Sequence, residues 1–292
     1  MKKNTLIISV AGSVLLIVFI IILVIVLRSG REIVYEEGVP NVAVTDFTKS
    51  MGKDLIKGLF PEATASVNTM SFDAAFESLV NGTNDVVLAM KPSEEMLNYS
   101  QDVMVEVEVI PIAKDALIVM NNRYNPVKNM TYDQFRKIYS GELKNWKDLE
   151  GSDLEILPYL NTASYDSYFA LKEVMNGAKL VTPKLTLKSP SFANIVKAIG
   201  TYEDTADYAV GYGMFYDIDD LFGNKNIQIL SINGVTPTVE TVKSGEYPLN
   251  VNIYAMIRKD SAENSRARRL VNFILSEEGQ NIIEKDGYFK IK

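Results

Sequence analysis

Residues 125–151 read NPVKNMTYDQFRKIYSGELKNWKDLEG, and this stretch decides the fold. Tyr132, Phe135 and Ile138 recur every third residue, which puts them on one apolar face of a helix. Gly141 follows, and a glycine at this place ends a helix in left-handed backbone. Because the strand pattern DALIVMNN comes just before, the stretch predicts the start of a second α/β unit in the middle of the chain.

The chain on the N-terminal side of this unit alternates strand and helix patterns. From Val39 onward the order is VAV, KSMGKDLIKGLF, TASVNTM, FDAAFESLVNG, DVVLAM and VEVEVIPI. We interpret this order as a βαβαβ series, which implies a mostly parallel sheet with right-handed crossovers.

The chain on the C-terminal side continues with strand LEILPYL, helices SYFALKEVMNG and SFANIVKAIG, and strand YAVGYGM. Strands IQILSI and LNVNIYAMIRK follow, and then one amphipathic helix, NSRARRLVNFILSEEGQNIIEK. The sequence therefore predicts two α/β lobes of similar size.

The N-terminus carries an almost uninterrupted apolar run from Thr5 to Leu27, with lysines before it and arginines after it. Its length is what a helix needs to cross a bilayer. It lacks the small residues of a signal-peptide cleavage site, and the chain has no cysteine for a lipid anchor. We expect one uncleaved transmembrane signal anchor in contact with the lipid bilayer, and a single-pass protein of the cell membrane whose body lies on the extracytoplasmic side.

Composition excludes several classes of function. The formal net charge is −7, and the first 31 residues carry four basic groups and no acidic group, so the rest carries about −11. We therefore expect no nucleic-acid partner. The absence of histidine and cysteine removes histidine-dependent triads and imidazole or thiolate metal sites, and no metal-loop pattern occurs. We expect no metal and no cofactor.

One enzyme hypothesis survives these exclusions. Ser50 to Lys53 matches the S-x-x-K pattern of penicillin-interacting enzymes, and Lys243-Ser244-Gly245 resembles their K-T-G triplet. That triplet must lie on a strand, whereas here it reads as a helix end followed by a turn, and no S-D-N triplet exists. We keep this as a remote alternative and predict that the chain is not an enzyme.

Three hydroxyl-bearing turns each lie between a strand and a helix: Thr45 to Thr48, Ser71, and Asn161 to Ser167. Each turn alone is explained by an N-cap, in which a side-chain oxygen accepts from the first turn of the helix. At the carboxyl ends of parallel strands, however, helix N-termini also bind anions. Both interpretations stay open at this point.

The stretch 125–151 resembles a segment of the phosphate-binding proteins of ABC importers, through NPV, an aromatic-rich helix and Y-S-G-x-L-x-N-W. The likeness continues at 79–95, 109–122 and 232–260, and in the closing helix pattern. The resemblance implies an α/β fold of the two-lobed, periplasmic-binding-protein-like kind (type II), preceded here by one transmembrane helix. The expected parts are 1–31 as cytoplasmic stub and anchor, 32–38 as tether, 39–116 plus 230–292 as lobe one, and 117–229 as lobe two.

The resemblance also implies a function, which is to capture a solute between the lobes and to deliver it to a membrane permease of the ABC type. Phosphate or a related oxyanion is the expected solute. A binding fold that acts as a sensor or scaffold, or that binds another solute, is the alternative. The side chains at the family's contact positions are Thr45, Thr48, Ser71, Lys91, Asn161, Ser164, Asp166 and Ser167.

The contact positions of lobe two depart from the family's pattern. Asn161 stands where the family has arginine, and Tyr165 and Asp166 replace serine and glycine. The cation is lost and a carboxylate is gained. Two like charges about 4 Å apart repel by about 1 kcal/mol in water, and by several times that in a partly buried cleft. The sequence therefore predicts that phosphate binding is weakened.

Overall fold

The structure is a computed structural model, and it describes residues 33–64, 67–162, 165–182, 192–200, 208–217 and 226–291. Residues Glu37–Lys292 form one compact unit, and Met1–Glu36 form another. The predicted transmembrane segment lies outside the described residues. Within those residues, no helix combines the length and the apolar character needed to cross a membrane.

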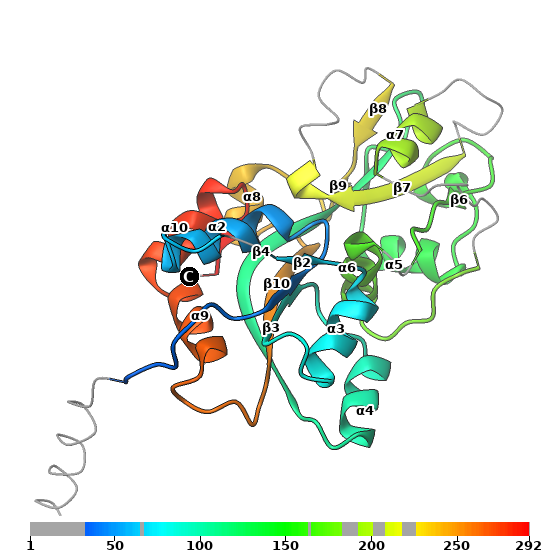
Figure 1. Cartoon of the computed structure of the whole chain (residues 1–292). Helices are drawn as coiled ribbons and strands as arrows, with labels where there is room; N and C mark the ends of the chain where they lie inside the picture. The colour runs from blue at the N-terminus through cyan, green and yellow to red at the C-terminus, as the bar shows by residue number, and fades with distance from the viewer. Residues whose placement is uncertain are drawn as a thin grey trace, which may run out of the picture. The chain divides into compact units, whose positions relative to one another are not determined.

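The central feature is a sheet built from nine of the described strands, in the order β2-β1-β3-β10-β4-β7-β6, with β8 and β11 also paired to β4 (Figure 1). Strand β1 pairs in parallel with β2 and β3, as the βαβαβ series predicts. Strand β10 is antiparallel to both β3 and β4. The first strands are β1 Val42–Val44, β2 Asn68–Thr69, β3 Val86–Ala89 and β4 Val107–Asn122. The later ones are β6 Leu157–Pro158, β7 Ala209–Met214, β8 Ile227–Ile229, β10 Asn250–Arg258 and β11 Phe289–Lys290.

Strand β4 corrects the prediction of two separate strands, because VEVEVIPI and DALIVMNN form one strand of 16 residues. Its first part, up to Ala116, pairs with β10, and its second part, from Leu117, pairs with β7 and β8. Pro111 donates no hydrogen bond, and the register of β10 shifts beside it, between Ile253 and Tyr254. This register shift lets β4 continue past Pro111 as one strand.

Helices α2, α3, α5, α6 and α7 lie on the segments that the sequence predicts as helices, whereas α4 was not predicted. In lobe one, α2, α9 and α10 lie together on one side of the sheet and α3 and α4 on the other (Figure 1). Helix α5 ends at Gly141, whose φ of 79° is the predicted left-handed cap. The bounds are α2 Lys49–Leu59, α3 Phe72–Val80, α4 Glu94–Asp102, α5 Tyr132–Ser140, α6 Asp166–Met175, α7 Phe192–Gly200, α8 Val239–Ser244, α9 Arg266–Ile274 and α10 Glu277–Lys285. A 3-10 turn at Trp146–Leu149 and a small parallel sheet of β5 Asn129–Met130 and β9 Ser231–Ile232 complete the list.

The C-terminal amphipathic segment is two helices rather than the one predicted. Ser276 accepts a hydrogen bond from the Gly279 backbone at 3.2 Å and so caps a new helix, α10. A Cβ atom on Gly279 would lie 2.2 Å from the Phe273 carbonyl oxygen, so the chain turns too tightly there for any other residue. The apolar period continues across the turn, which is why the sequence reads as one helix.

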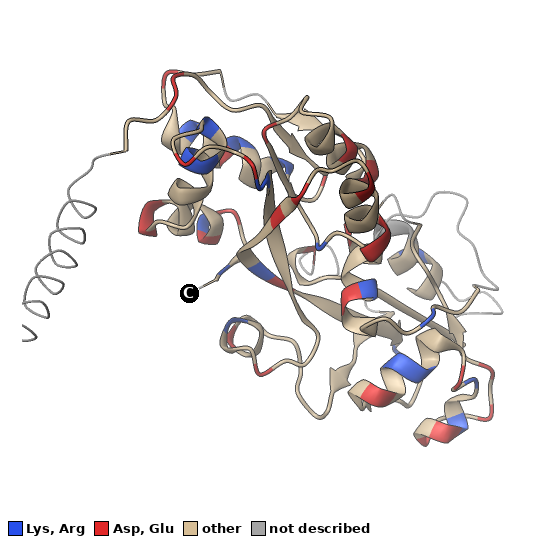
Figure 2. Cartoon of the chain, turned by 90° about the horizontal axis from the view of Figure 1, so that it is seen from below, with Lys and Arg blue, Asp and Glu red and all other residues tan. Residues whose placement is uncertain are grey.

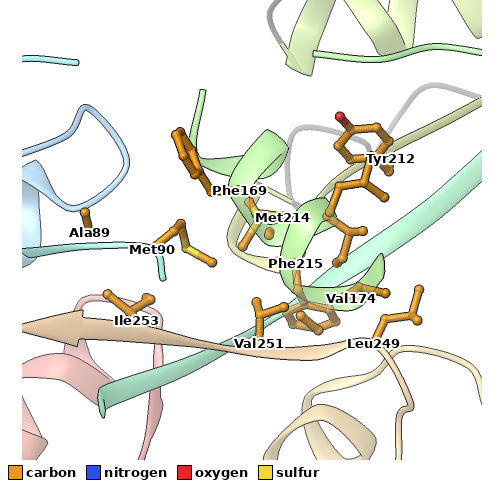
Figure 3. Close-up of a cluster of buried hydrophobic side chains, with 14 of the residues drawn as sticks. Ala89, Met90, Phe169, Val174, Tyr212, Met214, Phe215, Leu249, Val251 and Ile253 are labelled. Atoms are coloured by element: carbon orange, nitrogen blue, oxygen red, sulfur yellow. The ribbon is translucent and has the colours of Figure 1, made fainter. Parts of the chain in front are cut away.

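We use lobe one for the elements β1–β3, β10, β11, α2–α4 and α8–α10, and lobe two for β6–β8 and α5–α7. The expected boundaries at residues 116/117 and 229/230 stay a prediction. Apolar side chains of both lobes pack into one cluster, in which Met90 and Ile253 of lobe one approach Phe169 and Met214 of lobe two (Figure 3). Charged residues lie on the outer helices, with both signs interspersed (Figure 2).

The single tryptophan belongs to the core of lobe two. Trp146 is 0% exposed, and its indole Nε1 donates to the Tyr208 carbonyl oxygen at 3.1 Å. The indole therefore fills the core and offers no platform for a ligand.

Replacing this indole should destabilise the protein. We expect Trp146→Phe to lower the free energy of unfolding by about 1–3 kcal/mol, because it leaves a void and removes the hydrogen bond from the indole to the Tyr208 carbonyl oxygen. Denaturant titration followed by circular dichroism measures this change. Lys147→Ala, which removes an exposed ion pair with Asp153, is the control and should change the value by less than about 0.5 kcal/mol. An equal effect of both variants would contradict the core role.

Candidate functional site

A cleft of about 650 Å³ lies between the two lobes, where strand ends meet helix starts. Its walls come from the turns after β1, β2, β6 and β7, including the N-cap residue of α3, and from the first residues of α2 and α6. Lobe one contributes Thr45, Asp46, Phe47, Ser50, Thr69, Met70 and Ser71. Lobe two contributes Asn161, Tyr165, Asp166, Ser167, Met214, Tyr216 and Asp217.

The three helices that begin at the cleft have no side-chain cap. Thr48, Ser71 and Tyr165 occupy the N-cap positions of α2, α3 and α6, and none of them accepts a hydrogen bond there. The N-cap explanation of these turns is therefore wrong. By contrast, five other helices whose N-caps the structure describes do have such a bond: Ser93 of α4, Thr131 of α5, Thr238 of α8, Ser265 of α9 and Ser276 of α10.

Uncapped helix starts have a chemical consequence. The first backbone N–H groups of a helix have no partner within the helix, and the helix dipole adds positive potential there. Three such ends at one cleft form an arrangement that favours a negative group.

The turn after β1 is held by a chain of threonine hydrogen bonds. The Thr48 hydroxyl donates to the Leu88 carbonyl oxygen at 2.6 Å and accepts from the Thr45 backbone N–H at 3.1 Å. Thr48 is 0% exposed and does not line the cleft, so it shapes the turn without facing a ligand. Thr45 does face the cleft.

The Thr45 hydroxyl reaches across the cleft to lobe two. It donates to Oδ1 of Asp166, the first residue of α6, at 2.9 Å. Thr45 is 3% exposed and Asp166 is 9% exposed, so the bond is shielded from water. Next to it, Asn161 donates from Nδ2 to the Ser167 hydroxyl at 2.5 Å, and its backbone N–H donates to the Tyr212 hydroxyl at 3.0 Å.

The cleft is acidic. Asp46, Asp166 and Asp217 line it, and no lysine or arginine is among its described lining residues. Burial raises the pKa of Asp166 to about 7, and the charges of Asp46 and Asp217 act in the same direction, while the Thr45 hydrogen bond opposes them. Close to neutral pH, Asp166 therefore exchanges between its neutral and its charged form.

Three aromatic side chains pack together at the cleft. Tyr216 stacks on Tyr288 with ring centroids 4.5 Å apart, and the Phe47 ring meets both edge-on. The Tyr288 hydroxyl donates to the Phe47 carbonyl oxygen. Behind them, Asp115 of β4 accepts from the backbone N–H groups of Ala116 and Tyr216, and burial raises its pKa to about 8.

The structure brings together five of the eight predicted contact residues: Thr45, Ser71, Asn161, Asp166 and Ser167. Thr48 is structural, and Ser164 lies outside the described residues. Lys91 is exposed and lines a separate hollow of about 260 Å³, beside Lys172 and Glu173. Lys91 is therefore not among the described residues that line the cleft.

Sequence reasoning missed Asp217 and Tyr216 as cleft residues. Both follow the carboxyl end of β7, and the rule that ligands collect at such ends would have pointed to them. Asp46 lies in the first of the three hydroxyl-bearing turns. Among the described residues, no group of three or more His, Cys, Asp or Glu side chains is placed to hold a metal ion.

A family model described as a PBP superfamily domain matches residues 41–278. The chain belongs to the PBP superfamily. It is 29% identical over 236 residues to the phosphate-binding protein PstS of Staphylococcus haemolyticus (strain JCSC1435), a match that covers 78% of this chain and 72% of that protein.

Solved structures of the PBP kind share the architecture. An ABC-type phosphate transport receptor from Vibrio cholerae matches with a TM-score of 0.65 at 20% identity, over 86% of this chain and 99% of that one. A phosphate ABC transporter substrate-binding protein from Clostridium perfringens, with bound phosphate, matches with a TM-score of 0.61 at 25% identity, over 86% of this chain and 100% of that one. These matches confirm the two-lobed α/β binding-protein fold.

The buried Asp115 makes stability depend on pH. Because folding raises its pKa from 3.8 to about 8, the folded state holds a proton that the unfolded state releases within this window. Stability should therefore fall as pH rises from about 4 to about 8. We expect Asp115→Asn to reduce the drop in Tm between about pH 5 and about pH 8.

The control for this measurement is Asp153→Asn, at an exposed carboxylate whose pKa is lowered by the hydrogen bond from Asn145 and by Lys147. It should leave the drop in Tm in place. A drop that is as steep in Asp115→Asn as in the wild type would contradict this account of the buried carboxyl.

Proposed function

We propose that the chain is the solute-binding component of an ABC-type importer, which captures phosphate or a related oxyanion between its lobes and delivers it to a membrane permease. The observation that carries this proposal is the set of uncapped helix starts at the cleft. The names of its relatives in the PBP superfamily support phosphate as the first solute to test.

The described donors suit an oxyanion. The hydroxyls of Thr45, Ser71 and Ser167 line the cleft from both lobes, together with the starts of α2, α3 and α6. Hydroxyl and backbone N–H donors satisfy phosphate oxygens without a cation, although with less energy than an arginine provides. Asp166 in its neutral form adds one more donor.

The connection between the lobes suits closure around a solute. Strand β4 passes from one lobe to the other, and the chain returns after β8. Phe72 of lobe one meets Phe169 of lobe two edge-on at 4.7 Å, and the Tyr254 hydroxyl donates to Glu173 at 3.1 Å. Contacts of this kind form and break when two lobes rotate about short crossings.

We also propose that the apolar run from Thr5 to Leu27 anchors the protein as a single pass in the cell membrane, with residues 32–38 as tether and the lobes on the extracytoplasmic side. An anchored receptor stays close to its permease. The bilayer and the permease are then the partners.

A second candidate function follows from the three carboxylates of the cleft. Asp46, Asp166 and Asp217 without a described cation favour a solute that carries an amine, or a binding fold that serves as a sensor. An amine would bind more weakly to Asp166→Asn, whereas phosphate would bind more tightly to that variant.

A catalytic role has little support. Lys243, Ser244 and Gly245 end α8, where Gly245 caps the helix and Lys243 forms an ion pair with Glu284 at 2.9 Å. The triplet is not on a strand, as the penicillin-interacting enzymes require.

Phosphate titration of the full-length chain in mild detergent tests the proposal. We expect saturable binding by calorimetry, and about tenfold or greater loss of affinity in Ser71→Ala, because one hydrogen bond to a charged ligand contributes about 1.5–3 kcal/mol. Ser71 makes no cap bond, so the variant leaves α3 intact.

The matched control is Ser140→Ala, at a residue on the outer helix α5 that bonds to Glu142. It should bind phosphate as the wild type does. Absence of binding by the wild type at millimolar phosphate would overturn phosphate as the solute.

A further inference from the structure

The hydrogen bond between Thr45 and Asp166 connects the two lobes across the cleft. A hydroxyl has one hydrogen to donate, and Thr45 donates its hydrogen to the Asp166 carboxylate across the cleft. A solute oxyanion at this place would need the same hydrogen. The carboxylate also lies at the start of α6, which has no other side-chain acceptor.

We propose that Asp166 is an internal anion that occupies the oxyanion position of the cleft and competes with the solute, which makes it a specificity-determining residue. This inference rests on the proposed function, because it concerns the same cleft. The competing group is part of the chain, so its effective concentration is constant and high.

The acids that surround Asp166 strengthen the competition. Asp46 reaches the cleft from the turn after β1, and Asp217 reaches it from the turn after β7. No lysine or arginine is among the described residues that line the cleft, so a dianion meets like charges without compensation. The solute binds only after Asp166 swings away or takes up a proton.

An ordinary role as a helix-start carboxylate does not account for Asp166. Acidic residues at other helix starts are solvated, as for Asp133 on α5, whose side chain is 68% exposed and pairs with Lys137 in the next turn. Asp166 is 9% exposed and bonds to the opposite lobe. It therefore joins the lobes through the Thr45 hydroxyl, as a bound anion would.

Two substitutions of Asp166 test the inference by calorimetry on the full-length chain with inorganic phosphate. Asp166→Asn keeps the shape and removes the charge, and Asp166→Ser removes the bond to Thr45 as well. We expect both to bind phosphate about tenfold or more tightly than the wild type, since a like charge is lost. Asp133→Asn changes the net charge equally at another helix start, and it should bind as the wild type does.

The pH dependence of the phosphate affinity is a second measurement. It would not differ between wild type and variant if Asp166 had only a structural role. Lowering the pH from about 8 to about 6 should narrow the gap between wild type and Asp166→Asn, because the wild-type carboxyl becomes neutral. Asp46, Asp217 and the Tyr288 hydroxyl interact electrostatically with position 166, and they are present in both proteins. Phosphate itself also titrates, equally for both proteins.

The phosphate titrations of wild type and variants distinguish the inference from the proposed function. Tighter binding by a folded Asp166 variant, with Asp133→Asn unchanged, supports the inference, and either variant alone suffices if the other does not fold. Equal or weaker binding by the folded variants overturns the inference and leaves the proposed function standing when the wild type binds phosphate. No binding by any of the four proteins overturns phosphate capture and the inference with it.

Discussion

One strand holds the two lobes in register, and the cleft depends on it. Strand β4 pairs with β10 along its first part and with β7 along its second part. Because a strand is a stiff element with its backbone hydrogen bonds fixed on both sides, the carboxyl ends of β1 and β7 are brought to face each other. The turns that follow them, at Thr45 and Asp217, then line one cleft.

Most of the fold could be predicted because local signals agree with the packing. The parallel start of the sheet and the end of α5 at Gly141 follow from patterns within ten residues or so. The continuity of β4 could not be predicted, because Pro111 argues locally for a break and the compensating shift lies in β10. The division between α9 and α10 was hidden by a continuous apolar period, although Ser276 carries the signal of a cap.

In the candidate site, too, the sequence indicates which residues take part but not which residues they contact. Composition and turn patterns pointed to Ser71, Asn161 and Asp166, since these residues follow strands. The partner of Asp166 is 121 residues away in the chain, so no local pattern could reveal the bond to Thr45. Whether these residues cap their helices also needed the structure, because the same residue types do cap other helices, as Ser93 and Ser265 do.

The pairing of β4 with β10 has a consequence for the order in which the protein folds as it is made. Strands β6, β7 and β8 follow β4 within one stretch of chain, so lobe two closes on itself early. Lobe one waits for β10, α9 and α10 from the end of the sequence. Until they emerge, the fully buried strand β3 is an open, apolar edge, and sheet edges of this kind recruit other chains. The nascent protein is therefore expected to be most prone to aggregation before β10 is complete and pairs with β3.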